Sequence, residues 1–291
     1  MPLEELRRLV ARHARPDGTT PLDGVLLSKV SRSERPASST SGTVLAVIVQ
    51  GAKRLALGDR VYEYRAGQYL VASVDLPVTG HFTEASEAEP ALGVGLVLRP
   101  PAIAALLSET PPAPAVPAPS GIAVNTASDD LLDALVRLVR LIERPADRAV
   151  LAPMIEREIL WRLICSDGTV RQLGLADSNL TRVGRAVHWV RAHPAEPFRV
   201  EDLARRAGMS VSAFHRNFRA VTALSPIQFQ KQIRLQEARL RLAVRPADVA
   251  RAGREVGYES ASQFSRDYRR HFGVPPSQDV LGRPEPVRLV P

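Results

Sequence analysis

Two related stretches, AGMSVSAFHRNFR at residues 207–219 and VGYESASQFSRDYR at residues 256–269, decide the fold of the C-terminal part of the chain. Gly208 pairs with Gly257 at an offset of 49, whereas Phe214 pairs with Phe264 at an offset of 50, so the second copy has one extra residue in its turn. Because glycine readily adopts the positive φ of a tight turn, each copy is predicted to fold as helix, turn and helix.

The first copy is expected to have helices at residues 200–206 and 211–221, with Ser210 as the cap of the second helix. Phe214, Phe218 and Val221 recur at helical spacing and are expected to be buried against the preceding helix. Phe264 and Tyr268 take the buried places in the second copy. The side chains left to point outward are Ser212, His215, Arg216 and Arg219 in the first copy, and Ser262, Gln263, Arg266, Arg269 and Arg270 in the second.

The outward side chains are of types that read DNA bases. Arginine can bridge O6 and N7 of guanine, and glutamine can pair with N6 and N7 of adenine. An outward stripe near the start of the second helix is also the layout of a recognition helix, which enters the major groove. The alternative to DNA recognition is that the two basic helix faces are simply exposed to solvent.

A long helix is predicted between the two copies. Ser225 and Pro226 supply a cap and a first-turn proline, and residues 227–242 continue the helix. A further helix is expected at residues 181–193, packed under the first copy. A rigid connecting helix would fix the distance between the two recognition helices. To enter successive major grooves on one DNA face, these helices must lie about 34 Å apart.

The basic charge of the chain lies in its C-terminal part. Residues 180–291 contain 20 Lys and Arg against 10 Asp and Glu, whereas residues 1–179 contain 19 against 21. A positive field confined to one region favours a polyanionic partner such as double-stranded DNA. Composition bias is the alternative explanation, because 36 of the 39 basic residues are arginines.

The N-terminal part is predicted to contain a sheet followed by helices. Short β-rich runs with Gly and Asp turns indicate an antiparallel sandwich or barrel, and they lie at residues 43–49, 54–57, 61–64, 68–73, 81–83 and 92–98. Residues 111–119 are rich in proline and are expected to form an extended connector between the strands and the helices.

Two apolar helices are predicted at residues 128–142 and 149–165. They could complete the core of the barrel, or they could form the interface of a homodimer as an antiparallel helix pair. The sequence leaves both interpretations open.

Composition and charge exclude several classes of protein. With 45% hydrophobic and 24% charged residues, the chain has the composition of a soluble globular protein. Its longest apolar runs are far shorter than the roughly 20 residues that span a bilayer, and its first residues have no apolar signal segment. The single cysteine, Cys165, cannot form an internal disulfide, so we expect a cytoplasmic protein without a membrane partner.

No pattern in the sequence favours catalysis, a cofactor or a metal. His81 is the only histidine within the predicted strands, and no nucleophile elbow or phosphate-binding glycine loop is visible. We therefore expect no enzymatic activity. Cys165 ends an apolar run and is expected to be buried and inert, with a reactive thiolate near Arg162 as the alternative. Asp75 and His81 are candidates for an effector site at the barrel mouth, unless they belong to an ordinary loop.

Residues 181–282 resemble the DNA-binding domain of the AraC/XylS transcription regulators. The resemblance rests on Gly-Met-Ser at 208–210, Phe-x-Arg-x-Phe at 214–218, LQEAR at 235–239 and the long match at 256–276. It implies seven helices with two helix-turn-helix units. By family position it makes Ser212, His215 and Arg216 the base-reading residues of the first unit, and Ser262, Gln263 and Arg266 those of the second. Gln278-Asp279 departs from the family, which usually has Tyr-Arg there, so a DNA backbone contact from that end is in doubt.

The N-terminal part resembles one branch of the same family through residues 49–54, 57–64 and 72–80. In that branch a cupin-like β-barrel with a following helical hairpin senses a signal and dimerises. The resemblance implies an α+β chain with a sensing and dimerisation domain at 1–170, a linker at 171–180 and a double helix-turn-helix domain at 181–291. Within the first domain, the barrel is expected at about 22–110 and the helices at about 128–165.

Together these observations predict a sequence-specific DNA-binding transcription regulator. The expected form is an activator that responds to a small-molecule effector and recruits RNA polymerase. The alternative is a small-molecule-binding barrel protein whose basic domain is an interaction module, for which DNA affinity would be absent or independent of salt.

Overall fold

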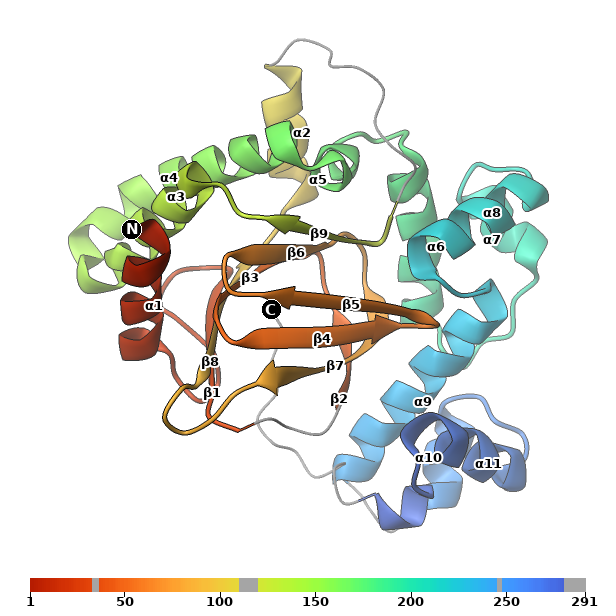
Figure 1. Ribbon diagram of the computed structural model, residues 1–291. Helices are drawn as coiled ribbons and strands as arrows, with labels where there is room; N and C mark the ends of the chain where they lie inside the picture. Colours follow the sequence, from red (N-terminus) through yellow and green to blue (C-terminus); the bar gives the residue numbers. More distant parts are fainter. Residues whose placement is uncertain (33–36, 110–119, 245–247, 280–291) are drawn as a thin grey trace. The chain divides into compact units, whose positions relative to one another are not determined.

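The computed structural model describes residues 1–32, 37–109, 120–244 and 248–279 (Figure 1). The chain divides into two compact units, of which the first covers residues 1–182 and the second begins at Val183. The proline-rich connector predicted at 111–119 lies outside the described residues.

The first unit combines strands and helices. Its strands are β1 (Val25–Val30), β2 (Ala37–Ser41), β3 (Val44–Gln50), β4 (Ala52–Leu57), β5 (Arg60–Arg65), β6 (Gln68–Ala72), β7 (Leu76–Glu84), β8 (Ala91–Val97) and β9 (Ile122–Thr126). Its helices are α1 (Pro2–His13), α2 (Pro100–Ser108), α3 (Asp129–Arg140), the 3₁₀ turn η1 (Leu141–Glu143), α4 (Pro145–Ser166) and α5 (Gly168–Leu173).

The strands form two antiparallel sheets. The five-stranded sheet has the order β1-β8-β3-β6-β9, and the four-stranded sheet has the order β2-β7-β4-β5. The expected α+β class is confirmed, but the sheets do not close into the cupin-like barrel. Closure would require ladders between the edge strands of the two sheets, and among the described residues no ladder joins a strand of one sheet to a strand of the other.

Strands β1 and β9 complete the five-stranded sheet at its two edges, and the sequence analysis did not identify them. β9 pairs with β6, so that Asn125 lies opposite Tyr69. The strands therefore extend beyond the range of about 22–110 expected for the barrel. The proline-rich segment is preceded by helix α2 and followed by β9, and thus does not separate strands from helices.

Helices cover the five-stranded sheet on the side away from the four-stranded sheet (Figure 1). Helix α3 begins at the cap residue Ser128, whose hydroxyl accepts a 3.2 Å hydrogen bond from the amide of Leu131. Seven apolar residues of α3 are buried, because this helix packs against both α1 and α4. The apolar face of α3 is therefore covered by other helices of the same chain.

Helix α4 buries only one of its faces. Ile159 and Leu163 are fully buried, whereas Val150, Met154 and Trp161 are 65%, 63% and 42% exposed. We call these three exposed residues the outer stripe of α4. Cys165 is also exposed, so its predicted burial is wrong. The physical reason is the helical period, which places residue 165 four positions after Trp161 on the outward face.

The segment expected as a linker at 171–180 begins inside helix α5. Asp167 caps this helix by accepting a 2.8 Å hydrogen bond from the amide of Thr169, and Val170 and Leu173 are buried. The two compact units meet in the chain between Arg182 and Val183.

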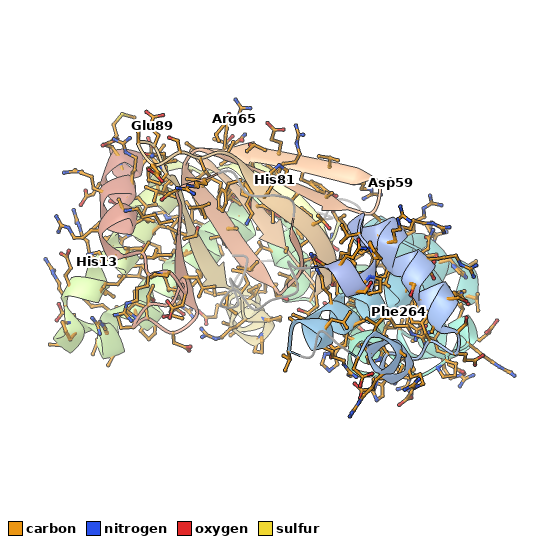
Figure 2. All side chains as sticks on the ribbon, turned by 90° about the horizontal axis from the view of Figure 1, so that it is seen from below. His13, Asp59, Arg65, His81, Glu89 and Phe264 are labelled. Atoms are coloured by element: carbon orange, nitrogen blue, oxygen red, sulfur yellow. The ribbon has the colours of Figure 1, made fainter. Side chains whose placement is uncertain are left out.

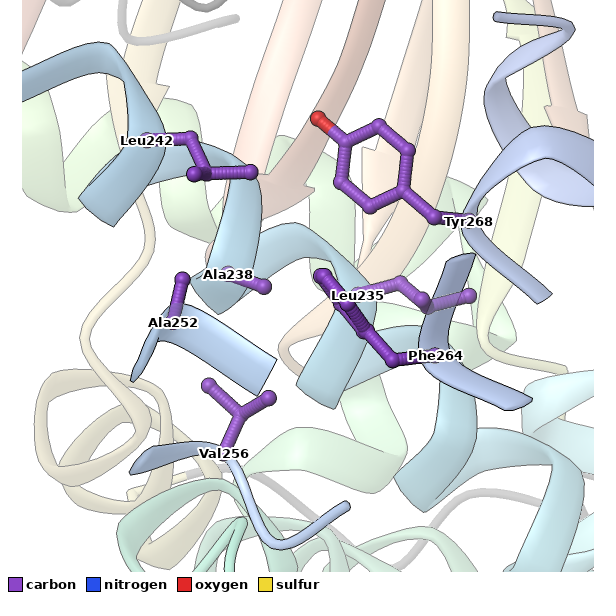
Figure 3. Close-up of a cluster of buried hydrophobic side chains, with 7 residues drawn as sticks. All are labelled: Leu235, Ala238, Leu242, Ala252, Val256, Phe264 and Tyr268. Atoms are coloured by element: carbon purple, nitrogen blue, oxygen red, sulfur yellow. The ribbon is translucent and has the colours of Figure 1, made fainter. Parts of the chain in front are cut away.

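The second unit is helical. It contains α6 (Asn179–Ala192, from Val183 onward), α7 (Val200–Arg206), α8 (Val211–Thr222), α9 (Pro226–Val244), α10 (Val249–Glu255), α11 (Ala261–Phe272) and the 3₁₀ turn η2 (Pro276–Gln278). Figure 3 shows the cluster of buried side chains that joins α9, α10 and α11, with Leu235 from α9 beside Phe264 and Tyr268 from α11. Figure 2 places Phe264 within this set of helices.

In the described part of the chain, no helix has the length and apolar character that crossing a membrane requires. The same residues contain no group of three or more His, Cys, Asp or Glu side chains arranged to hold a metal ion.

Candidate nucleic-acid interface

Helices α7 and α8 form the first predicted helix-turn-helix unit. Gly208 in the turn has a φ of +64°, and the hydroxyl of Ser210 accepts a 3.3 Å hydrogen bond from the amide of Ala213. The rings of Phe214 and Phe218 are fully buried, with their centroids 5.3 Å apart. The turn and the buried aromatic face predicted from the sequence are therefore confirmed.

The four residues of α8 predicted to contact DNA lie on its outward face. Ser212, His215, Arg216 and Arg219 are all exposed. Within the described residues, neither Arg216 nor Arg219 forms an ion pair, so both guanidinium groups are available to phosphates or bases.

Helices α10 and α11 repeat this geometry in the second helix-turn-helix unit. Gly257 has a φ of +87°, and the hydroxyl of Ser260 accepts a 3.4 Å hydrogen bond from the amide of Gln263. Phe264 and Tyr268 are fully buried. The exposed residues are those predicted, namely Ser262, Gln263, Arg266, Arg269 and Arg270.

A buried polar residue occupies the same position in both second helices, and the sequence analysis missed this feature. Asn217 of α8 donates a 3.0 Å hydrogen bond to the carbonyl oxygen of Ala213. Asp267 of α11, 50 residues later, forms a 2.6 Å ion pair with Lys231 of α9. The pair holds α11 against the connecting helix. Its partners lie 36 residues apart in the chain, so no local pattern announces it.

Arg234 of α9 joins the connecting helix to two turns. Its guanidinium donates hydrogen bonds of 2.6 Å to the carbonyl of Pro194, 3.1 Å to that of Ala195 and 3.1 Å to that of Gly257. Gln230, one helical turn earlier, donates to the carbonyls of Pro194 and Glu196. These bonds fix the turn between α10 and α11 relative to α9 and to the segment that precedes α7.

Asp279 stands where the resembled family usually has Tyr-Arg, and its side chain points into the protein. The hydroxyl of Tyr268 donates a 2.9 Å hydrogen bond to Oδ2 of Asp279, and Arg239 donates a 3.2 Å bond to Oδ1. Burial, assisted by this carboxylate, raises the pKa of Tyr268. Asp279 thus anchors the segment that follows α11 on α9 and α11.

Of the two expected effector residues, His81 lies outside the space between the sheets. His81 of β7 stands opposite Arg54 of β4, whose exposed side chain pairs with Glu63, so these three residues share the outer face of the four-stranded sheet (Figure 2). Asp75 is half-buried in the turn between β6 and β7.

Comparison with known proteins gives a family match for each of the two parts of the chain. The family model described as "AraC-type transcriptional regulator N-terminus" matches residues 21–171, and a "Helix-turn-helix domain" model matches residues 203–280. The transcriptional activator RhaS of Escherichia fergusonii is 27% identical over 148 residues, which are 50% of this chain and 53% of RhaS. The transcriptional regulator MtrA of Neisseria gonorrhoeae is 30% identical over 97 residues, which are 33% of this chain and 32% of MtrA. The chain thus spans about half the length of RhaS and about a third of MtrA.

Solved structures of ToxT from Vibrio cholerae share the fold. One gives a TM-score of 0.54 at 9% identity and covers 90% of this chain and 98% of ToxT. A second, with bound unsaturated fatty acid, gives a TM-score of 0.55 at 9% identity and covers 87% of this chain and 92% of ToxT. With its N-terminal family match extending over more than half of its residues and a helix-turn-helix match following it, the chain belongs to the AraC family of transcriptional regulators.

Proposed function

We propose that this protein binds double-stranded DNA sequence-specifically, with α8 and α11 each entering a major groove. The observation that carries the proposal is the repetition of one exposed face, polar and basic, on two helices that both pack on the connecting helix α9, α8 through Phe218 against Phe229 and α11 through Asp267 with Lys231. The eight residues that contact DNA in this proposal are Ser212, His215, Arg216, Arg219, Ser262, Gln263, Arg266 and Arg270.

The test is selection of genomic DNA fragments by the purified protein at two salt concentrations. We expect a sharp motif with two half-contacts about one helical turn apart, and an affinity that falls as salt rises because phosphate contacts release counterions. Equal, weak binding to all fragments would contradict the proposal.

We further propose that the protein is an activator whose first unit responds to a small-molecule effector and whose DNA-bound form recruits RNA polymerase. Its AraC-type N-terminal domain supports regulation by the first unit, the relative RhaS is named an activator, and a ToxT structure contains a fatty acid. An effector can act only by binding the DNA-competent arrangement with a different affinity from the incompetent one. In vitro transcription from a selected promoter, with and without effector, tests this directly; a template whose transcription does not rise with added protein would contradict it.

We also propose that the protein forms a homodimer through α4. The outer stripe of α4 leaves three large apolar side chains in water, and covering them is favourable by about 25 cal/mol per Å². Two-fold pairing of α4 with its copy covers the same stripe on both subunits at once. A shallow hollow beside the stripe adds to this surface and is lined by Leu106, Glu109, Met154, Arg157, Glu158 and Trp161.

The proposed regulator works in the cytoplasm, where it reaches its DNA, and has no catalytic role. Family membership supports both statements. An enzymatic activity tied to a metal or cofactor that copurifies with the protein would contradict the second.

A further inference from the structure

The two recognition helices can be compared residue by residue, because α11 repeats α8 at an offset of 50. Phe214 and Phe218 of α8 are buried, and so are Phe264 and Tyr268 of α11. Over the first ten residues of each helix, the same positions are buried and the same positions are exposed or half-buried. A side chain of α8 and the side chain 50 residues later therefore occupy equivalent places on the outward face.

Three outward positions carry the same residue in both helices. They are Ser212 and Ser262, Arg216 and Arg266, and Arg219 and Arg269. Arg216 and Arg266 are exposed, and neither forms an ion pair within the described residues. A free guanidinium can bridge O6 and N7 of guanine. We call the DNA that each helix contacts its half-site. Identical arginines at equivalent places cannot distinguish one half-site from the other.

At the third residue of each helix the two differ in chemistry. Gln263 of α11 is exposed, and within the described part of the chain its side-chain amide makes no hydrogen bond. The equivalent residue of α8 is Ala213, which is half-buried and has no polar side-chain atom. At the fifth residue the exposed His215 belongs to α8, and the equivalent Ser265 is half-buried. The second helix thus has a free carboxamide where the first has a methyl group.

The start of α11 holds Gln263 in place through its backbone. The amide N–H of Gln263 donates a 3.4 Å hydrogen bond to the hydroxyl of Ser260, and the hydroxyls of Ser260 and Ser262 lie 2.9 Å apart. The side chain of Ser262 is therefore engaged with the cap residue, whereas that of Gln263 is free. The hydroxyls of Ser210 and Ser212 form the same pair in α8, 3.4 Å apart. Because both helices have the serine pair, it cannot distinguish the half-sites.

Gln263 and Arg266 lie one helical turn apart on one face of α11. Three residues correspond to about 4.5 Å along the helix axis, and neighbouring bases of a DNA strand lie about 3.4 Å apart. A recognition helix presents the residues near its N-terminus to the base edges. These two side chains therefore contact bases within about two steps of each other. A carboxamide donates to N7 and accepts from N6 of adenine, and no other base presents this acceptor and donor together in the major groove.

We infer that Gln263 makes the DNA site asymmetric: the half-site of α11 contains an adenine within about two base steps of the guanine bound by Arg266, and the half-site of α8 has no equivalent adenine. At that place Ala213 offers only an apolar contact, which suits the methyl group of thymine. The inference rests on the proposed sequence-specific binding of DNA, and it names the base that distinguishes the two half-sites. Gln263 is the specificity-determining residue.

The experiment measures competition binding of the full-length protein to a site selected from genomic fragments, with all four bases tested at each position. Wild type should prefer adenine about tenfold at one position, within about two steps of a preferred guanine. Gln263→Ala, which gives α11 the residue of α8, should abolish the preference for adenine and keep that for guanine. Gln263→Glu should move the preference to cytosine, because a carboxylate accepts from N4 of cytosine and cannot donate to N7 of adenine.

The reverse exchange is the matched test in the first helix. Ala213→Gln should create a new preference for adenine in the half-site of α8. Because Ala213 is half-buried, the melting temperature of this variant is measured as well. The two Gln263 variants decide the question by themselves, since alanine and glutamate are both good helix formers at this exposed position.

Two results would overturn the inference and leave the proposed DNA recognition intact. In one, wild type selects a sharp motif and Gln263→Ala changes no base preference. In the other, the preference that Gln263→Ala removes is for a base other than adenine. If wild type selects no motif at all, the proposed function itself is wrong, and the inference is wrong with it.

Discussion

Nη1 of Arg234 donates a 3.1 Å hydrogen bond to the carbonyl oxygen of Gly257, and this bond ties the connecting helix to the turn of the second helix-turn-helix unit. The same guanidinium serves Pro194 and Ala195, so one side chain holds three backbone carbonyls. A planar group with five donors can do this, whereas the ammonium group of lysine cannot match its geometry.

Arg234→Met is therefore expected to lower the free energy of unfolding of the helical C-terminal part of the chain by about 2–4 kcal/mol, because three carbonyls lose a charged donor. Urea unfolding measures the change. Arg241→Met is the control in the same helix. Among the residues that the structure describes, Arg241 pairs only with the half-exposed Glu237 and Glu255, so its loss should cost less than about 1 kcal/mol. Equal losses for the two variants would show that Arg234 does not hold the turns.

The paired turn glycines should respond unequally to alanine. Both have positive φ, so each substitution carries a backbone strain of about 1–2 kcal/mol. At Gly208 a Cβ meets nothing within 4 Å, whereas at Gly257 it would lie 2.6 Å from the carbonyl oxygen of Ala195. Gly257→Ala should therefore cost at least about 2 kcal/mol more than Gly208→Ala in thermal or urea unfolding. Matching costs would contradict the close packing of the second turn.

Arg216→Ala and Arg266→Ala should each weaken binding to a selected site by about 1–3 kcal/mol and relax the base preference at one position. Competition binding with single-base variants of the site measures both effects. Arg205→Ala, on the exposed surface of α7, should change the affinity for specific and random DNA to the same extent. If the α8 and α11 variants also lose affinity equally on random DNA, these arginines contact phosphates rather than bases.

Lys53 should make stability depend on pH in a predictable direction. Its pKa is lowered to about 8 in the folded state from the usual 10.5, so between these values the unfolded chain binds more protons. The free energy of unfolding therefore rises with pH across this window, and the cost of burying the charge is fully present below pH 8. Lys53→Met should stabilise the protein by about 2–3 kcal/mol at pH 7 and by progressively less toward pH 10.5.

Urea unfolding from pH 7 to pH 10.5 checks this prediction. Lys29→Met is the control, because its side chain is exposed and its replacement should leave the pH profile unchanged. A difference between wild type and Lys53→Met that does not vary with pH would show that the lysine is not buried as a cation.

Met154→Glu should disrupt the proposed homodimer, because it places a charge in the middle of the outer stripe of α4. We expect the dimer dissociation constant to rise at least tenfold in sedimentation equilibrium. Val61→Glu is the matched control, since Val61 of β5 is also 63% exposed but lies away from α4. A wild-type protein that stays monomeric at high concentration would contradict the interface.

The sequence determined the helix-turn-helix units almost residue by residue. Helix α7 has the predicted bounds, α8 ends one residue later than predicted, and Phe214 and Phe264 are buried as expected. These features depend on signals that are only a few residues apart: a turn glycine, a serine cap and an aromatic repeat at helical spacing. The same periodicity placed the eight candidate DNA-binding residues on exposed faces.

Tertiary structure alone decided the features that depend on contacts between distant segments. Whether the strands form one barrel or two sheets depends on which edges pair, and β9 joins β6 across some 50 residues of chain. Lys53 looks like an ordinary surface lysine until its strand register turns it inward, and Cys165 looks buried until the packing of α4 is known. Short-range patterns fix which face a residue occupies, but only the packing of distant elements decides whether that face meets water or the protein interior.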